Sequence, residues 1–234
     1  MYVGTEDYLG RLEGGLREHG DPERAQGQKS YMKEKFQFFG LRAPERRELT
    51  RDLLRKNELP PMEDLRTITE SLWDRPEREY QYFGVELLER YVHHEDSLSM
   101  YEYIIVNKSW WDTVDRIAKN LVGGYFQMYP QQREAYIGKW LNSGNIWLQR
   151  TCLLFQLGYK EDTDVDMLFD VILELKDKNE FFIQKAIGWS LREYSKVDPG
   201  MVESFIKREK LSPLATREGM KVIGRASNRS RVTE

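Results

Sequence analysis

Apolar side chains recur along most of the chain at the three- and four-residue spacing that marks one face of a helix. The same-face positions of one such segment are Tyr80, Phe83, Gly84, Leu87, Leu88 and Tyr91, and those of another are Ile187, Leu191 and Tyr194. Alternating runs of β-branched residues closed by Asn-Gly or Asp-Gly, which would signal strands, do not occur. The pattern predicts about thirteen helices and no sheet, an all-α protein.

Prolines mark where these helices are expected to begin. Every proline lies at or just before the start of an apolar-periodic segment, where its missing N–H costs nothing and its fixed φ favours the first turn. The positions are Pro22, Pro44, Pro60, Pro61, Pro76, Pro130, Pro199 and Pro213. Asp21 and Asp198 each stand directly before a proline and are therefore candidate N-caps.

A longer period joins the helices into repeats. Similar helix-opening segments occur at residues 44–47, 76–79, 111–114, 147–150, 182–185 and 214–217, and their starts are 32, 35, 36, 35 and 32 residues apart. Each interval accommodates two helices of about fourteen residues and two turns. A helical hairpin cannot bury its own apolar face, so neighbours must stack. We predict one HEAT-like α-solenoid of about six hairpins over residues 1–224, followed by a disordered basic tail, residues 225–234.

The second helix of each hairpin should form the inner, concave surface of such a solenoid. The fourth positions of the six segments are Arg47, Glu79, Val114, Arg150, Lys185 and Arg217. Four of these six are cationic, and a cationic stripe on a concave face would suit a polyanion that is followed along its backbone. The alternative, that they are solvent-exposed first-turn residues with no partner, is left open by the sequence.

Composition narrows the class of protein. The 234 residues are 40% hydrophobic and 32% charged, as in a globular chain, and the formal charge of −3 argues against a uniformly cationic nucleic-acid coat. Residues 179–234 nevertheless carry 11 Lys and Arg against 7 Asp and Glu. A single cysteine, Cys152, excludes an internal disulfide, and His19, His93 and His94 offer little for a zinc site. We expect a reduced, intracellular protein with no metal, no cofactor and no membrane span.

One group of residues could carry chemistry. Trp111 and Asp115 are four residues apart and share a helix face. Arg150 lies in the helix-opening segment of the next repeat, and Trp189 lies in the repeat after that. A carboxylate among aromatic rings and an arginine is unusual for a plain scaffold. Each residue also has an ordinary interpretation, because tryptophans in helical repeats are more often core and Asp115 could be a solvated carboxylate near a helix N-terminus.

Three long motifs resemble the AlkD-type DNA glycosylases of the DNA alkylation repair family. They are SWWDTVD at 109–115, NIWLQR at 145–150 and FFIQKAIGWSLREY at 181–194. A shorter match in the N-terminal region comprises Tyr31-Met32-Lys33, Phe36, Gly40 and Pro44-Glu45-Arg46-Arg47. The resemblance extends from about residue 20 to residue 224. It implies a HEAT-like solenoid that excises N3- and N7-alkylated purines, such as 3-methyladenine and 7-methylguanine, in base excision repair.

The resemblance also assigns roles, residue by residue. It implies that Trp111, Asp115 and Trp189 are catalytic and that Arg150 contacts the DNA backbone. It also implies that Tyr31, Phe181 and Phe182 are aromatic residues of the DNA-binding cleft. The cationic stripe described above separately predicts Arg47, Lys185 and Arg217 as DNA-binding residues. The implied partner is double-stranded DNA with alkylated purines, bound by a monomer without a cofactor. The implied location is the cytoplasm of a bacterium, at the nucleoid.

The chemistry of such a substrate agrees with these residues. An N3- or N7-alkylpurine is positively charged and therefore leaves easily, while positive charge develops on the sugar. A carboxylate such as Asp115 would stabilise that charge and orient the attacking water, and the tryptophan faces would each contribute about 0.5–2 kcal/mol by cation–π attraction. Two alternatives are a family member that binds DNA without excision, and a protein-binding scaffold, whose inner face should be charge-neutral.

Overall fold

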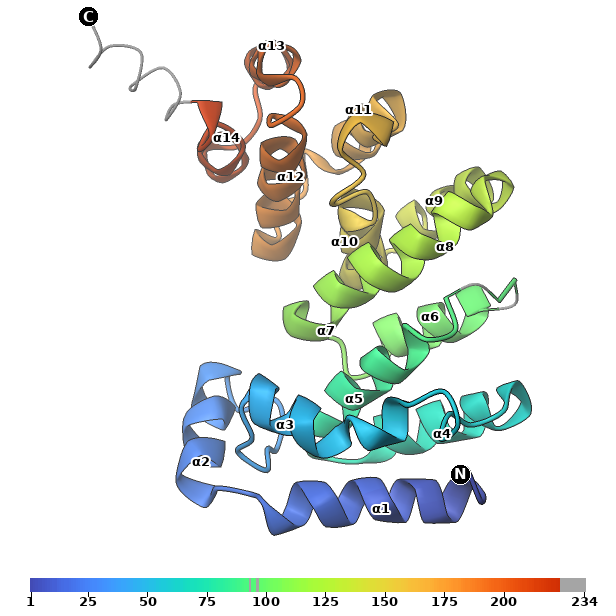
Figure 1. The fold of residues 1–234 in the computed structure, drawn as a ribbon. Helices are drawn as coiled ribbons and strands as arrows, with labels where there is room; N and C mark the ends of the chain where they lie inside the picture. Colours follow the sequence, from blue (N-terminus) through green and yellow to red (C-terminus); the bar gives the residue numbers. More distant parts are fainter. Residues whose placement is uncertain (93, 96, 224–234) are drawn as a thin grey trace, which may run out of the picture. The chain divides into compact units, whose positions relative to one another are not determined.

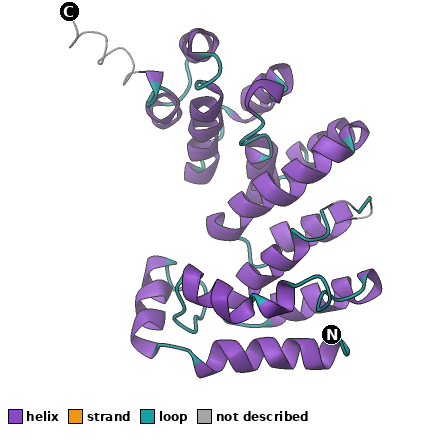
Figure 2. Cartoon of the chain, in the orientation of Figure 1, coloured by secondary structure: helices purple, strands orange, loops and turns teal. Residues whose placement is uncertain are grey.

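The computed structural model describes residues 1–92, 94–95 and 97–223, and these residues are helical or in turns and loops, apart from one isolated bridge between Gln37 and Glu77 (Figure 2). The prediction of an all-α protein is confirmed. His93 and the predicted tail, residues 225–234, lie outside the described residues. The chain divides into two compact units, Met1–Val92 and His93–Glu234. The prediction of a single repeat domain stays a prediction.

The first unit packs its helices around a core that includes Leu12, Leu65 and Phe83, all essentially inaccessible to solvent. In chain order its elements are α1 (Thr5–Glu18), α2 (Pro22–Tyr31), α3 (Ala43–Thr50), the 3-10 turn η1 (Asp52–Leu54), α4 (Met62–Asp74) and α5 (Arg78–Leu88), shown from blue to cyan in Figure 1. The apolar face predicted for residues 80–91 is buried here, which places α5 in the core.

The second unit continues the helical repeats. Its elements are α6 (Ser97–Val106), α7 (Trp111–Arg116), the π-helix η2 (Ile117–Val122), α8 (Gly123–Met128), η3 (Pro130–Gln132), α9 (Arg133–Leu141), α10 (Ile146–Leu154), η4 (Lys160–Asp162), α11 (Val165–Leu175), α12 (Phe181–Tyr194), α13 (Pro199–Glu209) and α14 (Pro213–Gly219) (Figure 1). Helix α10 packs against α7 and α12, and α12 packs against α14. Second helices therefore stack on one another within this unit.

Helix starts agree with the predicted period. Each of the six helix-opening segments begins a helix or lies within two residues of its start, at α3, α5, α7, α10, α12 and α14. The prolines also lie in a first turn or directly before it. Both predicted N-caps are confirmed, because the Asp21 carboxylate accepts the Arg24 N–H and the Asp198 carboxylate accepts the Met201 N–H.

A glutamine joins the two helices of several hairpins. The Gln81 amide donates to the Leu72 carbonyl at 2.6 Å, and the Gln149 amide donates to the Leu141 carbonyl at 2.8 Å. The Gln184 amide donates to the carbonyl of Lys176 at 2.9 Å. Each of these glutamines is the fourth residue of its helix and reaches the C-terminal end of the preceding one. They satisfy carbonyls that a helix end leaves without an internal donor, and they fix the hairpin angle.

Candidate functional site

Asp115 and Arg150 form a two-point ion pair in the second unit. Asp115 lies near the end of the short helix α7, and Arg150 lies in the middle of α10. The Arg150 Nε donates to Asp115 Oδ1 at 2.6 Å, and Nη2 donates to Oδ2 at 2.9 Å. Their side chains are 13% and 5% exposed, respectively. The planar guanidinium thus fixes both the position and the orientation of a carboxylate that still reaches the surface.

The Arg150 side chain has a third acceptor. Its Nη1 donates to the backbone carbonyl of Phe182, in the first turn of α12. A guanidinium carries five N–H groups, so two remain after these three bonds. The predicted contact of Arg150 with the DNA backbone stays a prediction, because what is seen directly is an arginine that orients Asp115 and ties α7, α10 and α12 together.

Aromatic rings gather beside this ion pair. The rings of Trp110 and Trp147 lie 5.6 Å apart, and each lies 5.0 Å from the ring of Phe182. Phe181 extends the cluster, at 5.4 Å from Phe182, and is 58% exposed. Each of the three rings belongs to the residue just before a second helix or to its first turn, so the helix starts of three repeats converge here. Trp110 and Trp147 were not among the predicted site residues.

The repeat period could have identified Trp147 but not Trp110, because the aligned segments begin at residues 111, 147 and 182. The predicted catalytic residue Trp111 is half-buried and directly follows Trp110, while Trp147 precedes Arg150 by three residues. The period aligns Trp147 with Phe182, 35 residues later. An aromatic residue at the same place in successive repeats predicts a ring contact, because second helices stack in register.

Burial determines the electrostatics of Asp115. Desolvation raises the pKa of its carboxyl above the ordinary value for aspartate, and the hydrogen bonds and positive charge of Arg150 oppose that rise. The nearby carboxylate of Asp112 raises the pKa further. Arg150 is thus the partner that favours the charged form of Asp115, against the burial that disfavours it.

The predicted stripe is not exposed along its whole length, because Arg150 is buried, with 4% of its surface exposed. It is also misaligned at two positions, where Glu79 and Val114 are completely buried. Counted from the observed helix starts, the equivalent fifth positions are Arg47, Tyr82, Asp115, Arg150, Lys185 and Arg217. The misalignment has a simple cause. The segment at residue 76 begins two residues before α5, and the segment at residue 111 begins with α7 itself, so its fourth residue is Val114 and not Asp115.

The remaining predicted DNA-binding residues are distributed over both units. In the first unit, Tyr31 is 71% exposed, and Arg47 donates to the buried Glu86 at 3.0 Å. In the second unit, Lys185 pairs with Glu218 at 2.8 Å. Arg217 is exposed, and within the described part of the chain no ion pair is seen for it. The predicted catalytic residue Trp189 is half-buried on α12.

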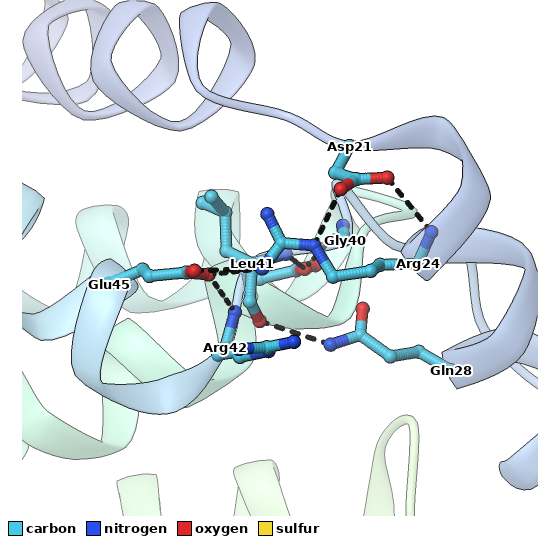
Figure 3. A network of polar contacts seen from close by, with 8 residues as sticks. Asp21, Arg24, Gln28, Gly40, Leu41, Arg42 and Glu45 are labelled. Carbon is cyan, nitrogen blue, oxygen red and sulfur yellow. Dashed lines mark hydrogen bonds and ion pairs between the residues drawn. The ribbon is translucent and has the colours of Figure 1, made fainter.

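Arg47 lies on a helix whose start is fixed by a polar network (Figure 3). The Arg24 guanidinium bridges two carboxylates, with Nε at 2.7 Å from Asp21 and Nη1 at 2.6 Å from Glu45. The Glu45 carboxylate also accepts the backbone N–H of Arg42 at 2.8 Å, the residue before α3. Helices α2 and α3 are thereby held together at their N-terminal ends, which sets the direction in which α3 presents Arg47.

The described residues contain neither a metal-ligand group nor a helix able to span a membrane. Over the described ranges, no group of three or more His, Cys, Asp and Glu side chains is arranged to hold a metal ion. No helix among those residues has the length and apolar character needed to cross a bilayer. Cys152 is buried, which raises the pKa of its thiol.

Comparison with known proteins identifies the family. The sequence profile of the family described as "DNA alkylation repair enzyme" matches residues 12–223. A solved structure, described as a predicted DNA alkylation repair enzyme from Enterococcus faecalis, is 37% identical in sequence, with a TM-score of 0.81. The alignment covers 86% of this chain and 95% of that chain. No curated protein matches the sequence.

Proposed function

This chain belongs to the DNA alkylation repair enzyme family, and from that premise we propose that it is a DNA glycosylase. Its substrates are N3- and N7-alkylated purines in duplex DNA, such as 3-methyladenine and 7-methylguanine. The reaction is hydrolysis of the bond between the base and the deoxyribose, the first step of base excision repair. A family that repairs alkylated DNA supports the substrate class, and the Asp115 site supports the reaction.

The observation that carries the proposal is the Asp115 carboxylate, 13% exposed and held at two points by Arg150. When an alkylpurine leaves, the bond electrons neutralise the positive base, and positive charge develops on the sugar. A fixed carboxylate in a poorly solvated place stabilises that charge without having to reorganise. Water then adds to the anomeric carbon and gives up a proton, which Asp115 can accept.

The aromatic residues have a matching role in the proposal. Trp111 and Trp189 would place the negative faces of their rings against the cationic base and sugar, with about 0.5–2 kcal/mol from each. Trp110, Trp147 and Phe182 already contact one another, so their part is to hold the starts of α7, α10 and α12 in place. Neither role requires a metal or an organic cofactor.

DNA contacts are proposed for three aromatic and four cationic residues, of which Arg150 is buried. Tyr31 and Phe181 are both more than half exposed and suit contact with sugars or bases. Phe182 belongs to the proposed cleft through its contact with Phe181. The cationic residues proposed to contact phosphates are Arg47, Arg150, Lys185 and Arg217. We propose that one copy of the chain binds one duplex, and that it works where the genome is, at the nucleoid.

The test is release of 7-methylguanine from a duplex with a single lesion. Purified protein in excess over DNA should release the base and leave an abasic site, faster than the buffer control and equally in the presence of EDTA. The same duplex without the lesion is the matched control. Tight binding without base release would favour the alternative of a DNA-binding family member, and absence of DNA binding would favour a protein scaffold.

A further inference from the structure

Glu218 of α14 is a buried carboxylate with three cationic neighbours. Its side chain is only 6% exposed, and it pairs with Lys185 at 2.8 Å, with Arg192 at 3.3 Å and with Lys221 at 2.6 Å. Lys185 and Lys221 hold the pKa of Glu218 at about 2, so the group is charged at any working pH. Glu218 is not among the predicted site residues, although its neighbour Lys185 is.

The backbone brings Glu218 very close to α12. A Cβ atom on Gly188 would lie 2.4 Å from the Cβ of Glu218, a distance that real side chains do not reach. Only glycine at position 188 therefore allows α14 to approach so closely. The close approach places the carboxylate of Glu218 against the part of α12 that carries Lys185 and Arg192.

Those two cations lie on either side of Trp189 along α12. Lys185, Trp189 and Arg192 are separated by four and three residues, which puts them on one face of the helix. Trp189 is one of the rings proposed to face a cationic base and sugar. Two positive side chains next to it would repel that substrate and could also occupy the ring face themselves.

We propose that Glu218 is a positioning residue that draws Lys185 and Arg192 away from Trp189. The negative charge of Glu218 makes the electrostatic potential at Trp189 less positive, so the face of that ring stays available to a cationic lesion. The outer N–H groups of Lys185 and Arg192 can still face phosphates. This inference rests on the proposed function, since it concerns the preference of that site for a positively charged purine. It predicts that Glu218 affects the rate for cationic lesions without contacting them.

The first variant is Glu218→Gln, which keeps the shape of the side chain but removes its charge. We expect single-turnover release of 7-methylguanine to fall roughly tenfold, the effect of an uncompensated unit charge within a Debye length of the reacting cation. Affinity for undamaged duplex should rise at low salt, because the freed cations can reach phosphates. Glu209→Gln is the matched control: Glu209 pairs with Lys176 and Arg208, so it changes the net charge equally.

A second variant separates positioning from simple support of the fold. The double variant Glu218→Gln with Lys185→Gln also lacks the Lys185 ammonium group that the first substitution frees. At saturating protein, its rate of base release should therefore recover at least half of the loss seen in Glu218→Gln, measured as the logarithm of the rate. A merely structural role predicts no recovery, because removing Lys185 cannot restore packing at α14. Thermal unfolding of each variant confirms that folded protein is compared.

An uncharged lesion completes the experiment. A duplex with 7-methyl-7-deazaguanine has the shape of the lesion without its positive charge. Glu218→Gln should not weaken binding to it, because the freed cations do not repel a neutral base. Equal rates for Glu218→Gln and Glu209→Gln, or no recovery in the double variant, would overturn the inference while wild-type base release still supported the proposed function. No base release by the wild-type protein would instead refute the proposed function, and this inference with it.

Discussion

Two buried carboxylates, one in each unit, show how similar features serve different purposes. Glu79 in α5 is completely inaccessible to solvent, and its oxygens accept the backbone N–H groups of Phe39, Gly40 and Leu41 at 3.0–3.2 Å. Asp115 in α7 is held by a side chain, Arg150, and remains partly exposed. Burial raises the pKa of both.

The difference lies in the donors and in the access that remains. Backbone N–H groups cannot move away from Glu79 without unfolding the loop at residues 39–41. The carboxyl group of Glu79 therefore stabilises the fold and has no free oxygen to offer a substrate. Gly40 in that loop has a φ of +91°, and a Cβ there would lie 2.0 Å from the Asp21 carbonyl oxygen, so the loop has little freedom to change. A raised pKa by itself therefore does not identify a catalytic carboxylate.

The largest expected effect is on the rate of base release. Asp115→Asn keeps the shape of the side chain but removes the charge that opposes the positive sugar. Release of 7-methylguanine should fall by about 10²–10³, the usual loss for a pre-organised electrostatic contact. The loss should be smaller for the more labile 3-methyladenine. Single-turnover base release and anisotropy binding on the same duplex would measure both, and affinity should not decrease. An unchanged rate would make Asp115 an ordinary helix-end carboxylate.

The corresponding change in the first unit should act on stability instead. In Glu79→Gln, three backbone N–H groups lose a carboxylate acceptor, and we expect the free energy of unfolding to fall by about 2 kcal/mol. Folded protein should release base at the wild-type rate. Urea unfolding with Glu48→Gln as a surface control measures this, because Glu48 is 67% exposed. A variant of normal stability and reduced rate would reverse the comparison between the two carboxylates.

The pH dependence of base release sharpens the comparison at Asp115. Only the ionised carboxylate is effective, and its pKa is raised by burial, so the rate should fall with decreasing pH earlier than for an ordinary aspartate. In Arg150→Gln the opposing positive charge is gone, and the acid limb should move to still higher pH. Rates corrected for spontaneous release give the profile. Identical acid limbs in the two proteins would show that Arg150 does not tune Asp115.

The linked effect on stability has a definite sign. Because the folded-state pKa of Asp115 lies above its unfolded value, the contribution of this group to stability is complete below the unfolded pKa and is lost as the pH rises through the folded pKa. The unfolding free energy of the wild-type protein, relative to Asp115→Asn, should therefore decrease with rising pH over that window.

The smallest expected effect concerns a single phosphate contact. Arg217 is exposed, so Arg217→Ala should weaken binding to lesion and plain duplex alike and should reduce the salt slope of log K by about 0.9. Lys207→Ala is the matched control, since Lys207 is 70% exposed and pairs with Glu203 on α13. A salt slope that changes equally in both variants would mean that Arg217 contributes only net charge.

Much of the fold could be predicted from the sequence, because it depends on local chemistry. Helix starts follow from prolines and from caps such as Asp21 and Asp198, which act within three or four residues. The repeat period follows from the need of each hairpin to bury one face against the next. The glutamines that join hairpins, such as Gln149 and Gln184, also recur at that period, although the sequence alone did not show which carbonyls they contact.

The sequence by itself therefore determined the helices, their period and the residue types of the candidate site. Only the tertiary structure decided which charges meet. The role of Arg150 at the DNA backbone stays a prediction, and its pairing with Asp115, 35 residues away, is what the structure adds. Glu218 was not singled out at all, yet it collects Lys185, Arg192 and Lys221 because Gly188 lets α14 approach α12. Helix formation depends on neighbours within one turn, whereas the pairing of charges depends on the packing of whole helices, which local patterns do not encode.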